Sequence, residues 1–215
     1  MLKEKGNKMT MESQSKISAK EYFNTAATHW DEKFLTPSLS YFLEGLVPEF
    51  GIETGQSILD VGTGTGVLIP YLIEAVGPSG SVTAIDYSEK MIQTCKRKHS
   101  HLKNVIIKVG DIEEIAFPAE TYDAVVCFGV FPHLENKQKA LLKISSLLKP
   151  SGKLVIAHAL SSEELKVHHK KVSEHVAHSM LPPEVEITRL LEQVGFVGIK
   201  IKDEPGCYLC IACKA

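Results

Sequence analysis

Residues 58–66, which read ILDVGTGTG, decide the fold of this chain. A short apolar run leads into glycines at every second position, as where a buried strand turns sharply into a helix. Glycine permits such a turn and also the close approach of a ligand to the main chain, and a helix N-terminus favours a negatively charged group. The stretch therefore predicts a strand, a ligand-binding turn and a helix, in that order.

Short apolar runs alternate with helical stretches along the rest of the chain, which indicates an α/β fold with helices on both faces of a mostly parallel sheet. Seven strands are expected, at Ser57–Val61, Ser81–Ile85, Val105–Val109, Ala124–Phe128, Lys153–Ala159, Val197–Lys202 and Cys207–Cys213. The first four are rich in Ile, Val and Leu, which predicts burial on both faces. The Pro150-Ser151-Gly152 turn is expected to lead into the fifth strand.

Helices are expected between the strands, at Thr65–Val76, Ser88–His99, Asn136–Leu148 and Glu184–Val194. Two further regions fall outside the alternation. Ala19–Phe50 predicts one or two helices before the first strand, and Ser161–Met180 predicts another after the fifth. Because ligands bind beyond the carboxyl ends of the strands in such sheets, we expect both regions to form a helical cap there.

Length and composition predict one domain, residues 17–215, behind a flexible polar tail, residues 1–16. The formal net charge is -2 and no basic stripe is visible, so a nucleic-acid partner is not expected. No apolar run approaches the length of a membrane span. Five cysteines, an odd number, favour reduced thiols in the cytoplasm. We expect a cytoplasmic monomer or homodimer with no membrane partner.

Two acids follow later strands. Asp86 ends the second strand, 20 residues after Gly66, where a carboxylate can accept both hydroxyls of a ribose. Asp111 ends the third strand. Position 67 is valine, so the G-x-G-x-x-G fingerprint of dinucleotide enzymes is incomplete, and no Gly-Lys-Ser/Thr follows to make a phosphate-binding P-loop.

This ordered set of motifs resembles the class I S-adenosylmethionine-dependent methyltransferases, in particular the branch that methylates quinones and other small metabolites. The resemblance covers roughly residues 22–196. It implies a Rossmann-like, seven-stranded, mostly parallel sheet whose last strand is antiparallel. It also implies S-adenosylmethionine as the cofactor and a small-molecule acceptor.

The resemblance further implies a cofactor-binding role for each residue of one set: Asp60, Gly62, Thr63, Gly64, Gly66, Asp86, Tyr87, Met91, Asp111, Ile112, Cys127, Phe128 and Gly129. The glycine turn would pack against the methionine and ribose, with Asp60 beneath it helping to hold the amine. Asp86 would take the ribose hydroxyls, and residues 87, 91, 111 and 112 would surround the adenine. Residues 127–129 would line the methionine end. Alternatively, Asp60 only fixes the turn, Tyr87 and Met91 are ordinary core residues, and Cys127 is a small buried apolar residue.

His133 is the candidate general base, because it follows the fourth strand and histidine titrates near neutral pH. Alternatively, it caps the next helix. The predicted acceptor pocket takes Tyr22 and Trp30 from the first cap region, His158 from the end of the fifth strand, and His168 and His175 from the second cap region. The late histidines could instead bind a metal or be exposed; we assign no metal ligands.

The C-x-x-C-x-x-C spacing of Cys207, Cys210 and Cys213 invites a metal-site interpretation. In a strand, however, neighbouring members of this series face opposite sides, and the outer two lie about 20 Å apart. Two competing functions remain open at this point: a nicotinamide-dependent oxidoreductase, and a non-catalytic module that binds the cofactor or a metal.

Overall fold

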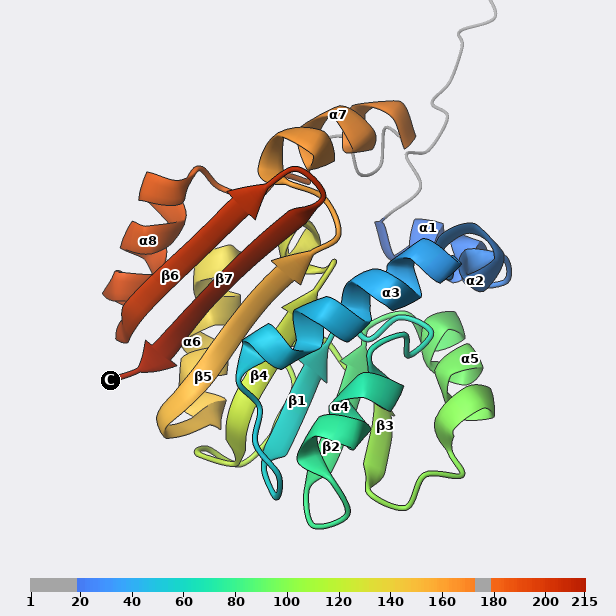
Figure 1. Cartoon of the computed structure of the whole chain (residues 1–215), viewed down its shortest axis with the longest axis horizontal. Coiled ribbons are helices and arrows are strands. Elements are labelled where there is room, and N and C mark those ends of the chain that lie inside the picture. The colour runs from blue at the N-terminus through green and yellow to red at the C-terminus, as the bar shows by residue number, and fades with distance from the viewer. Residues whose placement is uncertain (1–18, 173–178) are drawn as a thin grey trace, which may run out of the picture.

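A computed structural model describes residues 19–172 and 179–215 of the chain. These residues contain one seven-stranded sheet in the order β3-β2-β1-β4-β5-β7-β6 (Figure 1). Its strands are β1 (Ser57–Val61), β2 (Ser81–Asp86), β3 (Val105–Val109), β4 (Tyr122–Phe128), β5 (Leu148–His158), β6 (Phe196–Glu204) and β7 (Cys207–Lys214). Strands β1 to β5 pair in parallel, and β7 runs antiparallel to both of its neighbours. The predicted fold class is confirmed.

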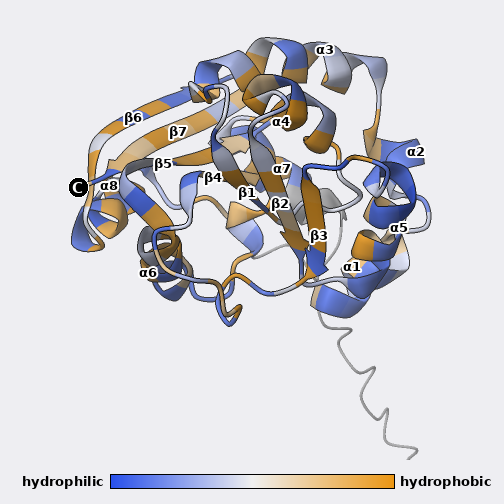
Figure 2. Cartoon of the chain, turned by 90° about the horizontal axis from the view of Figure 1, so that it is seen from below, coloured by the Kyte–Doolittle hydropathy of each residue, from blue (hydrophilic) through white to orange (hydrophobic). Residues whose placement is uncertain are grey.

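Helices cover both faces of this sheet (Figures 1 and 2). In chain order, the helical elements are α1 (Ala19–Ala26), α2 (Trp30–Phe34), α3 (Pro37–Leu46), η1 (Val47–Phe50), α4 (Ile69–Val76), α5 (Glu89–His99), η2 (Phe131–His133), α6 (Lys137–Leu147), α7 (Ser162–Val172) and α8 (Glu184–Gln193). Helices α3 and α4 pack on one face, and α6 and α8 on the other. No helix in the described part of the chain has the length and apolar character to cross a membrane.

The core consists of two apolar layers separated by the sheet. Alternate side chains of a strand point to opposite faces. In β1, Ile58 therefore packs with α3 and α4, whereas Leu59 packs with α6, and both are 0% exposed. Burial on two faces explains why apolar residues predominate in the middle of β1 and β4.

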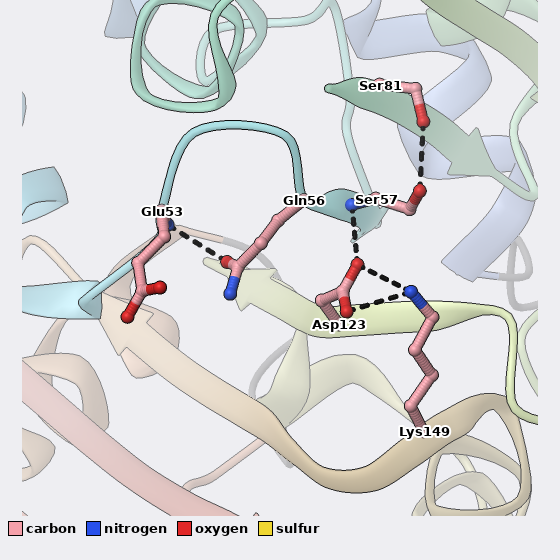
Figure 3. Close-up of polar contacts among 6 residues, drawn as sticks. All are labelled: Glu53, Gln56, Ser57, Ser81, Asp123 and Lys149. Atoms are coloured by element: carbon pink, nitrogen blue, oxygen red, sulfur yellow. Dashed lines mark hydrogen bonds and ion pairs between the residues drawn. The ribbon is translucent and has the colours of Figure 1, made fainter. Parts of the chain in front are cut away.

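The amino ends of the central strands are joined by polar contacts around Asp123 (Figure 3). One oxygen of Asp123 accepts a hydrogen bond from the Ser57 main-chain N–H at 2.8 Å. Lys149 Nζ lies 2.8 and 2.9 Å from the two carboxylate oxygens. Partial burial acts to raise the pKa of Asp123, but these hydrogen bonds outweigh it and hold the pKa below its ordinary value. The contacts link β1, β4 and β5 at the edge opposite the cap.

The N-terminal cap region differs from the sequence prediction. One or two helices were expected over Ala19–Phe50, whereas the structure has α1, α2, α3 and the 3₁₀ helix η1. The breaks have local causes. Thr36 caps α3 by accepting from Leu39 N at 3.2 Å, and prolines stand at the first turns of α3 and η1. Proline lacks the N–H that a continuous helix would need, so it starts a new element.

The helix after the glycine turn begins later than predicted, at Ile69 and not at Thr65. Gly62, Gly64 and Gly66 have φ values of 69°, 57° and 89°, in the left-handed region that interrupts a helix. The turn therefore occupies residues that the apolar periodicity had placed in the helix.

Two strand predictions are also corrected. The predicted turn at residues 150–152 lies inside β5 as an irregularity, where pairing with β4 shifts between Tyr122↔Leu148 and Ala124↔Lys153. Strand β3 is an edge strand and is not buried on both faces, since Ile106 is 52% exposed. Its own residues do not reveal this, because strand order is a tertiary property. The predicted helix over Ser161–Met180 is α7 as far as Val172, and residues 173–178 lie outside the described residues.

Candidate functional site

A cavity of about 400 Å³ lies at the carboxyl ends of β1, β2, β4 and β5, between the sheet and the cap. This volume falls within the range of small-molecule sites. Its wall includes most of the residues singled out from the sequence: Gly62, Thr63, Gly64, Asp86, Tyr87, Met91, Phe128, Gly129, His133, Tyr22, Trp30, His158 and His168. The fold thus brings residues from α1, α2, α5, α7 and four strand ends around one space.

The three glycines of the turn have different roles. A Cβ on Gly62 would lie 2.3 Å from a methyl carbon of Val130, and one on Gly66 would lie 2.6 Å from the His99 ring. Both glycines are needed so that the turn can pack against its neighbours. A Cβ on Gly64 would meet only Trp30 Nε1, at 4.0 Å. The main chain at Gly64 is therefore open to the cavity.

Among the residues that the structure describes, Asp86 is the one carboxylate that lines this cavity. One of its oxygens accepts from Gly64 N at 3.0 Å and the other from Ser88 N at 2.8 Å. The residue is 7% exposed, and burial raises its pKa to about 6 despite these hydrogen bonds. Each carboxylate oxygen can accept a second hydrogen bond, so Asp86 keeps capacity for hydroxyl donors.

Asp60 lies beneath the glycine turn and does not line the cavity. It is 1% exposed, and its carboxylate accepts a hydrogen bond from Thr63 Oγ1 at 2.6 Å. Burial raises the pKa of Asp60 to about 7, the Thr63 hydrogen bond lowers it, and the charge of Asp86 raises it further. Asp86 on the cavity wall and Asp60 beneath the glycine turn are therefore two acids whose charged forms would be stabilised by a cation.

The cap is fastened to the sheet by polar contacts from α1 and α2. Asn24 Oδ1 accepts from Ser88 Oγ at 2.7 Å, at the start of α5. One oxygen of Asp31 accepts from Thr65 Oγ1 at 2.5 Å, and the other lies 2.8 Å from Lys98 Nζ. Asp31 therefore joins α2 both to the glycine turn and to α5, which keeps the neighbouring Trp30 next to Gly64.

Three histidines line the cavity. His133 ends η2, and its ring meets the edge of Phe23 with centroids 5.2 Å apart. His158 ends β5, with its ring centroid 6.4 Å from that of Phe128. His168 comes from α7. His175, the fourth predicted pocket histidine, lies outside the described residues.

Some predicted cofactor residues lie away from the cavity wall. Besides Asp60 and Gly66, they are Asp111, Ile112 and Cys127. Asp111 is exposed and accepts from Glu113 N at 2.9 Å, and Ile112 is buried in the core on the α6 side. Cys127 is 0% exposed, and burial raises the pKa of its thiol, which keeps it protonated.

Sequence reasoning missed Lys33 and Phe34, which line the cavity from α2, and Asp31, which fastens that helix. The sequence does contain a signal for Lys33 and Phe34. Positions 30, 33 and 34 have the i, i+3, i+4 spacing that places side chains on one face of a helix. The short length of α2 and the polar residues around it concealed the pattern.

The cysteine series does not form a site in the described part of the chain. Cys207, Cys210 and Cys213 lie in β7, where the middle residue is buried and the outer two are half-buried. This alternation is that of a strand. No group of three His, Cys, Asp or Glu side chains among the described residues could hold a metal ion.

The cavity fits S-adenosylmethionine, the cofactor that the resemblance implies. Asp86 can still accept hydrogen bonds, which suits the ribose hydroxyls. The two buried acids, Asp60 and Asp86, suit a ligand with positively charged sulfur and ammonium groups. Open main chain at Gly64 and Gly129 leaves room for the ligand, because a Cβ on Gly129 would meet only His158 Nε2, at 4.0 Å.

Comparisons with known proteins agree with this geometry. Residues 52–197 match a family model described as a methyltransferase domain. A demethylmenaquinone methyltransferase from Staphylococcus aureus is 27% identical over 75% of this chain and 76% of its own length. A crystal structure of a SAM-dependent methyltransferase from Aquifex aeolicus is 28% identical, covers 89% of this chain and 98% of its own, and has a TM-score of 0.71.

A phosphoethanolamine N-methyltransferase from Haemonchus contortus, solved in complex with S-adenosyl-L-methionine, has a TM-score of 0.72. It is 18% identical over 90% of this chain and 58% of its own, so it shows the fold alone.

Proposed function

Because the chain belongs to the methyltransferase domain family and is an S-adenosylmethionine-dependent methyltransferase, we propose that it methylates a small-molecule acceptor with His133 as general base. The family assignment decides against the nicotinamide oxidoreductase and the non-catalytic module. The observation that carries the proposal is the capped cavity, about 400 Å³ in volume, in which the glycine turn, Asp86 and His133 share one wall.

The residues around the glycine turn would hold the cofactor. Asp86 would accept the ribose hydroxyls, and Tyr87 and Met91, which line the same wall, would contact the adenine. Asp60 would act through its negative charge beneath Thr63. Asp111, after β3, would accept the adenine amine and the Ile112 main chain would contact the ring, although neither residue lines the cavity of the ligand-free protein. Phe128 and Gly129 would border the methionine end.

A small molecule is the acceptor that suits a cavity of this size beneath a cap. The cap residues Tyr22, Phe23, Trp30 and Phe34 present aromatic rings to the space, which favours an apolar or aromatic acceptor. The staphylococcal relative, named for demethylmenaquinone, supports the same class of acceptor.

S-adenosylmethionine, when bound, supplies a methyl group on a positively charged sulfur. The protein's contribution is mainly positioning, which can lower a barrier by about 7–11 kcal/mol. The cap would exclude water, and its aromatic rings would orient the acceptor. A ring nitrogen of His133 would take the proton that the acceptor atom loses and pass it to solvent.

Calorimetric titration with S-adenosylmethionine tests the cofactor assignment. We expect micromolar binding by the wild type and at least tenfold weaker binding by Asp86→Ala, because the ribose hydroxyls lose their acceptor. Glu74→Ala removes the same charge from an exposed position of α4 and should bind like wild type. No binding by the wild type, or equal losses in both variants, would refute the assignment.

A further inference from the structure

The nitrogen bases on the acceptor side of the cavity come from four separate elements. We call them the basic wall: Lys33 of α2, His133 of η2, His158 of β5 and His168 of α7. In contrast, the lining residues that the structure describes include one carboxylate, Asp86. That carboxylate is on the cofactor side and already accepts hydrogen bonds from two main-chain N–H groups.

Lys33 contributes a full positive charge to this wall. Two lysines near the cap are paired with acids: Lys20 with Glu89, and Lys98 with Asp31. No ion pair joins Lys33 to an acid of the described residues, although it stands among charged residues of α2. It is exposed and lines the cavity, which places its charge at the mouth.

Aromatic rings lie beside the histidines of the wall. Phe23 meets His133 edge to face, and Phe128 lies beside His158, with centroid distances of 5.2 and 6.4 Å. An acceptor in this space would therefore contact aromatic surface and nitrogen bases at the same time.

We infer that the acceptor is an apolar, ring-containing molecule with an acidic group that binds as an anion against the basic wall; the inference rests on the proposed function. A buried charge is costly unless it is paired. An anion would find the Lys33 ammonium and imidazoles that can donate hydrogen bonds or become protonated. A cationic amine would find like charge at the mouth and no uncommitted carboxylate on the described acceptor side.

Three naphthalene ligands of matched shape test this charge preference: 2-naphthoate (anionic), 2-naphthamide (neutral) and 2-naphthylmethylammonium (cationic). Each is titrated into the full chain saturated with S-adenosylhomocysteine, which has no methyl group to transfer. We expect 2-naphthoate to bind at least tenfold more tightly than either of the others.

Variants of Lys33 test whether the basic wall causes this charge preference. Lys33→Met should weaken 2-naphthoate binding at least threefold and leave 2-naphthamide unchanged, and Lys33→Arg should keep the preference. Lys20→Met, which removes the same charge from α1 away from the cavity, is the matched control and should behave like wild type.

The outcomes separate the inference from the proposed function. If S-adenosylhomocysteine does not bind, the proposed function fails and the inference fails with it. If it binds but the amide or the ammonium compound equals 2-naphthoate, or none of the three binds, the inference alone is overturned. Equal effects of Lys33→Met and Lys20→Met would also overturn it.

Discussion

Asp60 shows how a single residue of the site opposes the stability of the ligand-free fold. It is 1% exposed, and burial raises its pKa to about 7. Its folded-state pKa is above the unfolded value, so the stability that its protonated form contributes is present at low pH. That contribution is lost as the pH rises through about 7. Such environments are typical of functional sites, where a ligand charge compensates for the cost.

Replacing Asp60 by Asn removes the charge and keeps an acceptor for the Thr63 hydroxyl. We expect Asp60→Asn to raise the thermal midpoint of the ligand-free protein at pH 8, with a smaller difference at pH 5. Affinity for S-adenosylmethionine should fall at least tenfold, which corresponds to ~1.4 kcal/mol. Thermal unfolding and calorimetry measure both, with Glu74→Gln as the control. A lower midpoint with unchanged affinity would contradict the assigned role.

His133 carries the proposed base role. General-base catalysis typically contributes about 100-fold or more to the rate. We expect His133→Gln to lower kcat about 100-fold and to leave cofactor affinity unchanged. Demethylmenaquinone, the compound in the name of the staphylococcal relative, is the first acceptor to try in this assay. His101→Gln, an exposed histidine after α5, is the control. An unchanged kcat in His133→Gln would exclude His133 as the base.

At the scale of elements, α2 depends on few contacts of its own. It has only five residues, Trp30–Phe34, too few for an isolated helix to be stable. Asp31 holds it against Thr65 of the glycine turn and Lys98 of α5. Because α2 carries Trp30 and Lys33 to the cavity, we expect this attachment to hold the cap over the cavity.

Removing the attachment should loosen the cap without unfolding the protein. We expect Asp31→Ala to speed S-adenosylhomocysteine dissociation about tenfold, while the free energy of unfolding changes by about 1 kcal/mol, as for a partly exposed ion pair and hydrogen bond. Trp30 is the single tryptophan of the chain, so stopped-flow fluorescence reports on the cap directly. Glu32→Ala changes the same helix at its contact with His29 and should leave dissociation unaltered. Equal rates for Asp31→Ala and wild type would exclude the attachment role.

In the whole molecule, stability and function divide between the two edges of the sheet. The carboxyl edge carries buried acids with raised pKa values, whereas the amino edge carries Asp123 with a lowered pKa. The pH dependence of stability that Asp123 contributes is therefore opposite to that of Asp60. Its contribution to stability is present above its unfolded pKa and is lost as the pH falls through the lower folded value.

We expect Asp123→Asn to lower the free energy of unfolding at pH 7 by about 1 kcal/mol, because a partly exposed charged hydrogen bond is lost. The difference from wild type should shrink below pH 4, where the wild-type carboxylate also becomes protonated. Cofactor affinity should not change. Urea unfolding at several pH values and calorimetry measure these quantities. A loss of affinity in Asp123→Asn would show that the two edges are coupled.

Local sequence patterns were sufficient to predict the sheet, the family and the cofactor. Two predicted strands, Ser57–Val61 and Val105–Val109, coincide with the observed ones, because a short run of mainly apolar residues between turns is a local signal of a strand. The late start of α4 was missed, since the left-handed glycines of the turn override the apolar periodicity on either side. The exposure of β3 was missed because it depends on strand order.

Local sequence patterns were enough to predict an α/β sheet with a glycine turn at the end of its first strand and an acid at the end of its second. These features depend on residues close together in the chain. Only the tertiary structure decided which side chains share the cavity: it brought in Lys33, placed Asp31 against Thr65, and left Asp111 outside. Such contacts join residues far apart in the chain, and the packing of the cap on the sheet selects them.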